Sequence, residues 1–144
     1  MATMTRTIGT VSSSKGKVNK TNVALWITQS ALALVFLGAG SSKLLMSAEQ
    51  MASQSEIDFP LWFMRFIGVC EVAGALGLIL PSVSRIRTGL TPLAACGLIV
   101  IMVGAVVSTA IAMSVPAATF PLAVGMAAAF VAYGRTHLAP ITQR

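Results

Sequence analysis

Four apolar segments of near-bilayer length dominate this sequence and restrict what it can fold into. They cover about residues 22–42, 61–80, 89–110 and 117–133. A helix of about 20 apolar residues crosses the roughly 30 Å hydrocarbon core of a bilayer. Backbone N–H and C=O groups in lipid must find partners within their own segment, so each segment is expected to be helical. We therefore predict an all-α integral membrane protein, with a bundle of four transmembrane helices within residues 22–135.

Composition argues against a soluble domain. Hydrophobic residues make up 56% of the 144 residues and charged residues only 10%, whereas about 25% charged residues are usual in soluble domains. The formal net charge is +6, but the basic residues lie at the ends of apolar segments and lack interleaved surface aromatics. We therefore expect the lipid bilayer as a partner, and no nucleic acid.

The charged residues also predict an orientation. Basic residues without acidic neighbours lie before the first segment, between the second and third, and after the fourth. They include Lys15, Lys17, Lys20, Arg85, Arg87, Arg135 and Arg144. By the positive-inside rule these stretches share the cytoplasmic side, which places both termini in the cytoplasm. Glu49, Glu56 and Asp58, together with Lys43, then fall in a loop on the other side.

The two ends of the chain differ from the apolar segments. Residues 1–21 are rich in Thr, Ser, Gly and Lys without periodicity, which predicts a disordered basic cytoplasmic tail. Residues 136–144 are expected to form a short second tail. A cleavable signal peptide is the competing interpretation of the first segment. It is disfavoured because the apolar run exceeds the usual h-region of about 7–15 residues.

Prolines and small residues predict where helices end and how they pack. Pro60, Pro92 and Pro121 lie at or near helix starts, and Pro81 is expected to end the second helix. Small residues four positions apart allow close helix contact, either within the bundle or on a homo-oligomer face. These pairs are Ala73 and Gly77, Gly104 and Ser108, Ala105 and Thr109, Gly125 and Ala129, and Ala128 and Ala132.

Glu71 is the candidate functional residue, because it lies near the middle of the second apolar segment. A carboxylate at that depth costs about 2.5–3.5 kcal/mol even on insertion scales. Three of its nearest neighbours on the helix face are small, so another helix can approach and shield it from lipid. Lys43, at the outer end of the first segment, is the best candidate partner. Arg65 is a second candidate, but it lies about 120° away around the same helix, which disfavours an intrahelical pair.

Three interpretations of Glu71 remain open at this point. The first is a helix–helix pair with Lys43 or with hydroxyl and backbone groups. The second is a protonated acid that hydrogen-bonds a neighbour, relays protons or binds a quinone carbonyl. The third is a transport site for a small polar solute.

The remaining reactive side chains do not form a recognisable catalytic set. Cys70 and Cys96 lie inside apolar segments, where a redox pair is conceivable but inert thiols are more usual. His137 follows the fourth segment and is expected to be interfacial and solvated. With one histidine, a bis-His haem within this subunit is excluded. We therefore predict no catalytic residues, no metal and no covalent cofactor.

Four strings resemble the DoxX-like family of small four-helix bacterial membrane proteins. They are FLGAGSSKLL at 36–45, GVCEVAGALGLILP at 68–81, GLTPLAACGLIVIMVGAVV at 89–107 and AYGR at 132–135. The resemblance implies that Lys43 and Glu71 occupy recurring charged positions and that Arg135 occupies a C-terminal one. Thr109 stands where many relatives have a histidine. A bacterial inner (cytoplasmic) membrane location is implied with the family.

Named relatives are associated with quinone-linked oxidation of sulfur compounds and with thiol or oxidative-stress complexes. The resemblance therefore predicts a non-catalytic or accessory subunit of a quinone-linked redox system. Quinone is the candidate cofactor, and redox-complex subunits or a second copy are the candidate partners. The alternative is a small proton-coupled transporter or solute-binding membrane protein that uses Glu71. The candidate supporting residues are Arg65, Cys70, Cys96, Thr109 and Arg135.

Overall fold

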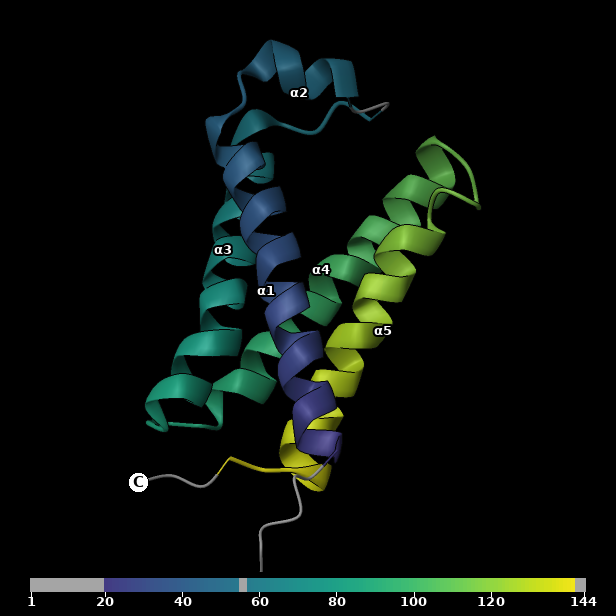
Figure 1. Cartoon of the computed structure of the whole chain (residues 1–144). Helices are drawn as coiled ribbons and strands as arrows, with labels where there is room; N and C mark the ends of the chain where they lie inside the picture. The colour runs from purple at the N-terminus through teal and green to yellow at the C-terminus, as the bar shows by residue number, and fades with distance from the viewer. Residues whose placement is uncertain (1–19, 55–56, 142–144) are drawn as a thin grey trace, which may run out of the picture.

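The computed structural model describes residues 20–54 and 57–141, and every regular element in these ranges is helical (Figure 1). The elements are α1 (Lys20–Leu45), α2 (Ala48–Gln54), α3 (Leu61–Ser84), α4 (Leu90–Ala112), α5 (Thr119–Tyr133) and the π-helical turn η1 (Gly134–Leu138). The all-helical class is therefore confirmed. Most of the predicted N-terminal tail lies outside the described residues, although its last two residues, Lys20 and Thr21, already belong to α1.

Three of these helices, α1, α3 and α4, are long and apolar enough to cross a membrane. The fourth predicted span corresponds to α5, which has 15 residues and runs directly into η1. Large apolar side chains such as Leu34 and Val100 are more than 70% exposed. Such exposure is costly in water but neutral in lipid. The structure thus supports a membrane location.

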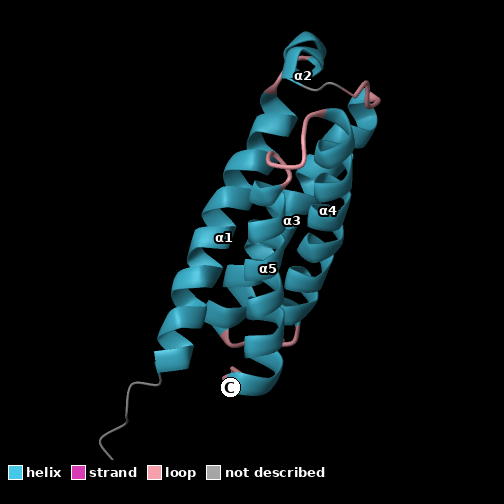
Figure 2. Ribbon diagram, turned by 90° about the vertical axis from the view of Figure 1, so that its right-hand side faces the viewer, coloured by secondary structure: helices cyan, strands magenta, loops and turns pink. Residues whose placement is uncertain are grey.

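The helices pack as two antiparallel pairs. In Figure 1, α1 lies along α3 and α4 lies along α5, and the pairs diverge toward the end that carries α2. We call this end the α2 end. The opposite end, here called the terminal end, holds the start of α1, the turn between α3 and α4, and η1 (Figures 1 and 2).

The predicted stop of the second helix at Pro81 is wrong, because α3 continues to Ser84 with Pro81 buried inside it. Proline is tolerated inside membrane helices where neighbouring groups satisfy the freed backbone. Near Pro81 the Ser82 hydroxyl donates to the carbonyl of Leu78 and the Ser84 hydroxyl donates to that of Leu80, each one turn earlier in α3. The other prolines lie as predicted, with Pro60 before α3, Pro92 in the first turn of α4 and Pro121 in that of α5.

The turn that follows α3 contains two arginines in the left-handed region. Arg85 has φ 56° and closes the helix, and Arg87 has φ 49°. Glycine is the residue that usually takes this conformation at a helix C-terminus. The turn between α3 and α4 therefore combines positive charge with a strained backbone.

The loop expected between the first two spans contains the short helix α2. Its N-terminus is closed by a capping box: the Ser47 N–H donates to Gln50 Oε1 at 3.1 Å, and the Gln50 N–H donates to Ser47 Oγ at 3.3 Å. Glu49 lies in the first turn, where its negative charge interacts favourably with the positive end of the helix dipole. Met51 is the buried hydrophobic residue of α2.

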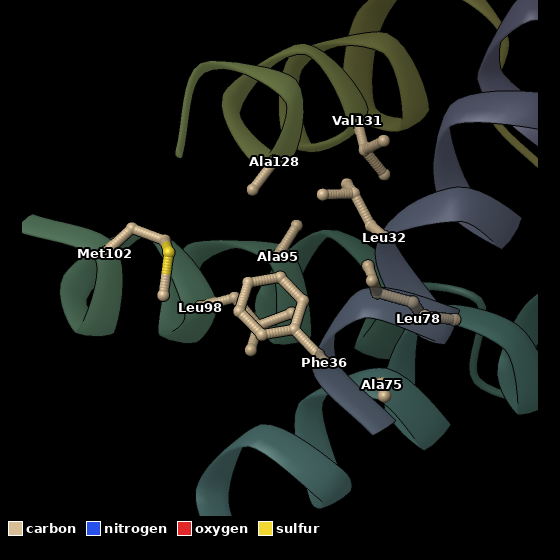
Figure 3. Close-up of a cluster of buried hydrophobic side chains, with 10 residues drawn as sticks. Leu32, Phe36, Ala75, Leu78, Ala95, Leu98, Met102, Ala128 and Val131 are labelled. Atoms are coloured by element: carbon tan, nitrogen blue, oxygen red, sulfur yellow. The ribbon is translucent and has the colours of Figure 1, made fainter. Parts of the chain in front are cut away.

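An apolar cluster fills the middle of the bundle (Figure 3). All four long helices contribute to it: Leu32, Ala33, Phe36, Ala75, Leu78, Ala95, Leu98, Met102, Ala128 and Val131. Most of these side chains recur at three- or four-residue spacing on their helices, which is the pattern of one helical face. The cluster therefore joins the two helix pairs to each other.

The contact between α1 and α3 depends on two glycines. A Cβ atom added at Gly40 would lie 2.7 Å from the backbone oxygen of Gly68, and one added at Gly68 would lie 3.0 Å from that of Gly40. Backbones that approach this closely are typical of membrane helix pairs with small interfacial residues. By contrast, a Cβ at Gly38 on the same helix would meet nothing within 4 Å.

We expect Gly40→Ala to destabilise the protein by about 1–3 kcal/mol, because α1 and α3 must move apart to admit the methyl group. Gly38→Ala is the matched control and should leave stability unchanged or slightly raised. Thermal unfolding of both variants in detergent provides the measurement. Equal melting temperatures for the two variants would contradict the close contact.

Candidate functional site

Lys43 and Glu71 form an ion pair that joins α1 to α3. Lys43 Nζ lies 2.8 Å from Glu71 Oε2 and 2.9 Å from Oε1, so the ammonium donates to both carboxylate oxygens. The Glu71 side chain is 3% exposed and that of Lys43 is 24% exposed. The carboxylate is thus enclosed by protein, while the lysine reaches the surface of the bundle.

The glycine contact positions this ion pair. Gly40 lies three residues before Lys43 on α1, and Gly68 lies three residues before Glu71 on α3, so each glycine shares a helix face with its charged residue. The stem of Lys43 also packs on Gly68, whose missing side chain leaves room for it: a Cβ there would lie 3.1 Å from Lys43 Cβ. The small residues therefore bring the helices close enough for the two charges to meet.

The electrostatics of the pair follow from its surroundings. A lone carboxylate among apolar side chains is strongly unfavourable, and an adjacent ammonium offsets that cost through the low local dielectric. Both carboxylate oxygens are occupied by the same partner. The arrangement can therefore hold two helices together, and the Lys43 side chain remains partly exposed.

A second polar cluster, which the sequence analysis missed, lies toward the terminal end. Gln29 on α1 is fully buried, and its Nε2 donates to the carbonyl of Leu78 and to Ser82 Oγ at 2.8 Å. The Ser82 hydroxyl lies 2.9 Å from that of Thr91 on α4. Gln29 Oε1 accepts a hydrogen bond from Arg135 Nε at 3.0 Å. This cluster links α1, α3, α4 and η1.

Arg135 lies at the centre of the terminal end and is only 4% exposed. Its Nη1 donates to Asn22 Oδ1 at 2.7 Å and to the carbonyl of Ala139 at 3.4 Å. Its guanidinium carbon lies 5.1 Å from the centre of the Trp26 ring, a cation–π distance. The sequence signal was Asn22 and Gln29, two amides spaced seven residues apart on one helix face in an apolar segment. Neutral amides cost less to bury than charges, so their presence in an apolar segment is a weaker signal.

The other candidate residues lie apart from these clusters. Arg65 is exposed on α3, Cys70 is half-buried and Cys96 is exposed, and both cysteines are free thiols. Thr109 is half-buried near the α2 end of α4. His137 is exposed, with its ring 5.0 Å from that of Tyr133. Within the described ranges, no three His, Cys, Asp or Glu side chains are grouped to hold a metal ion.

The two polar clusters are separated by the apolar cluster. On α1 the order is Gln29, then Leu32 and Phe36, then Lys43. On α3 the order is Glu71, then Ala75 and Leu78, then Ser82. Figure 3 shows Phe36, Leu78 and Leu98 among the side chains of this layer. The ion pair therefore lies toward the α2 end, separated from the Gln29 cluster by apolar side chains.

We expect Glu71→Ala to destabilise the protein by about 2–3 kcal/mol, because Lys43 loses its partner, with a discount for the partial exposure of the lysine. Glu71→Gln retains an acceptor and should cost only about 1 kcal/mol. The double variant Lys43→Met/Glu71→Met should recover most of the loss, since no charge remains unpaired. Thermal unfolding in detergent measures all three. An unchanged melting temperature for Glu71→Ala would refute the pairing role.

Comparison with known proteins places these features in a family. The sequence profile of the DoxX-like family matches residues 27–131, which is well over half of the chain and includes both Lys43 and Glu71. The matched range ends before Arg135. No curated protein and no solved structure matches the chain at the significance required. The chain belongs to the DoxX-like family, a family of small membrane proteins.

Proposed function

We propose that this protein is an accessory, non-catalytic subunit of a quinone-linked redox system in the bacterial inner membrane. The observation that carries the proposal is the use of the buried polar groups. Both carboxylate oxygens of Glu71 and both polar atoms of Gln29 are engaged in bonds between helices. Because these groups are engaged in bonds between helices, we assign them a structural role rather than a catalytic one. The quinone-linked role itself comes from the family resemblance.

A second element of the proposal is the topology: four membrane-spanning helices with both termini in the cytoplasm. α5 and η1 together give a continuous helical path over residues 119–138. The start of α1 and the end of η1 lie at the same end of the molecule (Figure 2). Basic residues gather at that end, namely Lys20, Arg85, Arg87 and Arg135, whereas Glu49 and Asp58 lie at the α2 end. This distribution supports a cytoplasmic terminal end by the positive-inside rule.

The topology predicts opposite labelling of two engineered cysteines. In a background lacking Cys70 and Cys96, Ser53→Cys in α2 should react with a membrane-impermeant maleimide on intact cells. Ser84→Cys at the end of α3 should react only after the membrane is permeabilised. Ser53 and Ser84 are both exposed, so reactivity reports the side of the membrane rather than burial. Labelling of both positions from outside would contradict the proposed orientation.

The place for a quinone in this proposal is beside Lys43. The Lys43 side chain is partly exposed while Glu71 is buried, and we propose that a quinone carbonyl diffusing in the bilayer accepts a hydrogen bond from the lysine ammonium. The transporter alternative is less well supported, because the apolar cluster lies between the two polar clusters and leaves no polar path along the described bundle. A pH-dependent uptake signal in proteoliposomes, lost in Glu71→Gln, would favour that alternative.

The accessory role predicts that activity belongs to a complex. Purification in mild detergent from the native membrane should recover the chain with a redox-active partner subunit, and the complex should reduce a short-chain quinone analogue. The isolated chain should give less than about one hundredth of that rate, because it offers no catalytic constellation. Quinone reduction by the isolated chain, abolished in Cys70→Ser, would show instead that it is an enzyme in its own right.

A further inference from the structure

The guanidinium of Arg135 has an unused hydrogen-bond donor. Nε and Nη1 donate to Gln29, Asn22 and Ala139, but Nη2 is buried and has no hydrogen-bond partner within the described part of the chain. Buried polar groups are almost always paired, and leaving one unpaired costs about 1–3 kcal/mol, more for a charged group. The hydrogen bonding of Arg135 is thus incomplete, and Nη2 can still donate to a further acceptor.

No acidic residue within residues 20–54 and 57–141 pairs with Arg135. All three acceptors that it contacts are neutral: two amide oxygens and one backbone carbonyl. Among the described acidic residues, Glu49 and Asp58 lie at the α2 end and Glu71 is paired with Lys43. Burying a cation without a counter-charge is strongly unfavourable. The missing acceptor is therefore expected to be an anion.

The position of Arg135 suggests which anion. The residue lies in η1, which directly follows the apolar helix α5. In the topology proposed above, this end of the bundle lies at the level of the lipid headgroups. Lys20, Arg85 and Arg87 are exposed at the same end and add positive potential. Basic sites between membrane helices bind the phosphate groups of anionic lipids, and arginine matches phosphate with a two-pronged geometry.

We infer that Arg135 anchors a binding site for the phosphate of an anionic phospholipid at the terminal end of the bundle. Nη2 supplies the free donor, and the surrounding basic residues attract the headgroup. Protein atoms cover Nη2, so the phosphate must displace some of them. The hydrogen bond to the Ala139 carbonyl is the longest one that the guanidinium makes, at 3.4 Å, so we expect this contact to be the one that is displaced. The inference does not depend on the redox role.

The test compares lipid binding by the full chain in a neutral detergent, using native mass spectrometry with phosphatidylglycerol and phosphatidylcholine at equal concentrations. The wild-type protein should retain phosphatidylglycerol preferentially. Arg135→Gln should bind it about tenfold more weakly, the loss of one charge-assisted contact. Arg87→Gln is the matched control: the arginine is exposed at the same end, and its removal should change binding by less than about twofold. An equal loss of phosphatidylglycerol affinity in both variants would show that only general electrostatic attraction is at work. That result would overturn the proposed site at Arg135.

Two further variants keep the inference testable if Arg135→Gln does not fold. Arg135→Lys retains the charge and should retain a preference for phosphatidylglycerol. Asn22→Ala removes one internal acceptor and leaves the guanidinium intact, so it should bind phosphatidylglycerol at least as tightly as the wild type. Weaker binding in Asn22→Ala would contradict the inference.

A final competition experiment distinguishes binding of a lipid headgroup from binding of free phosphate. Inorganic phosphate at millimolar concentration should fail to displace phosphatidylglycerol, because it lacks the acyl chains that place the lipid beside α5. Displacement by inorganic phosphate would show that the site takes small phosphates and would overturn its assignment to lipid. Equal retention of phosphatidylcholine and phosphatidylglycerol would show that the anionic charge is irrelevant, with the same consequence.

Discussion

The backbone contact between Gly40 and Gly68 is the constraint on which the candidate site depends. It brings α1 and α3 close enough for Lys43 to reach Glu71, and it leaves room for the lysine stem on the opposite helix. Without this approach the carboxylate would face lipid or an unfilled space. The ion pair in turn satisfies the only acidic side chain within the described membrane-spanning helices. Packing and charge therefore support each other at one crossing point.

The protein divides into layers along its long axis. The ion pair lies toward the α2 end, the apolar cluster fills the middle, and the cluster around Gln29 and Arg135 closes the terminal end. Apolar contacts alone would allow the helices to pack in more than one register. Each polar layer bonds specific residues on different helices to one another. Buried hydrogen bonds have a direction and a length, whereas apolar contact does not, so the polar layers fix the register of the bundle.

The sequence predicted the features that depend on long-range averages or on strong local penalties. The apolar runs located all four long helices. The cost of burying a carboxylate singled out Glu71, and the small residues on its helix face indicated that another helix packs there. The failures concern compensation between elements. Pro81 was expected to end a helix, but α3 continues through it to Ser84. The burial of Arg135 depends on amides more than one hundred positions away in the chain. The capping box of α2 was present in the sequence and could have been found.

The turn between α3 and α4 shows how synthesis and folded-state stability can make opposite demands on one residue. Glycine at position 85 or 87 would relax the left-handed backbone by about 1–2 kcal/mol. In the topology proposed above, it would also remove a positive charge that favours a cytoplasmic location for this turn. On that proposal, the two left-handed arginines are a cost in folded-state stability that is accepted for the sake of correct insertion.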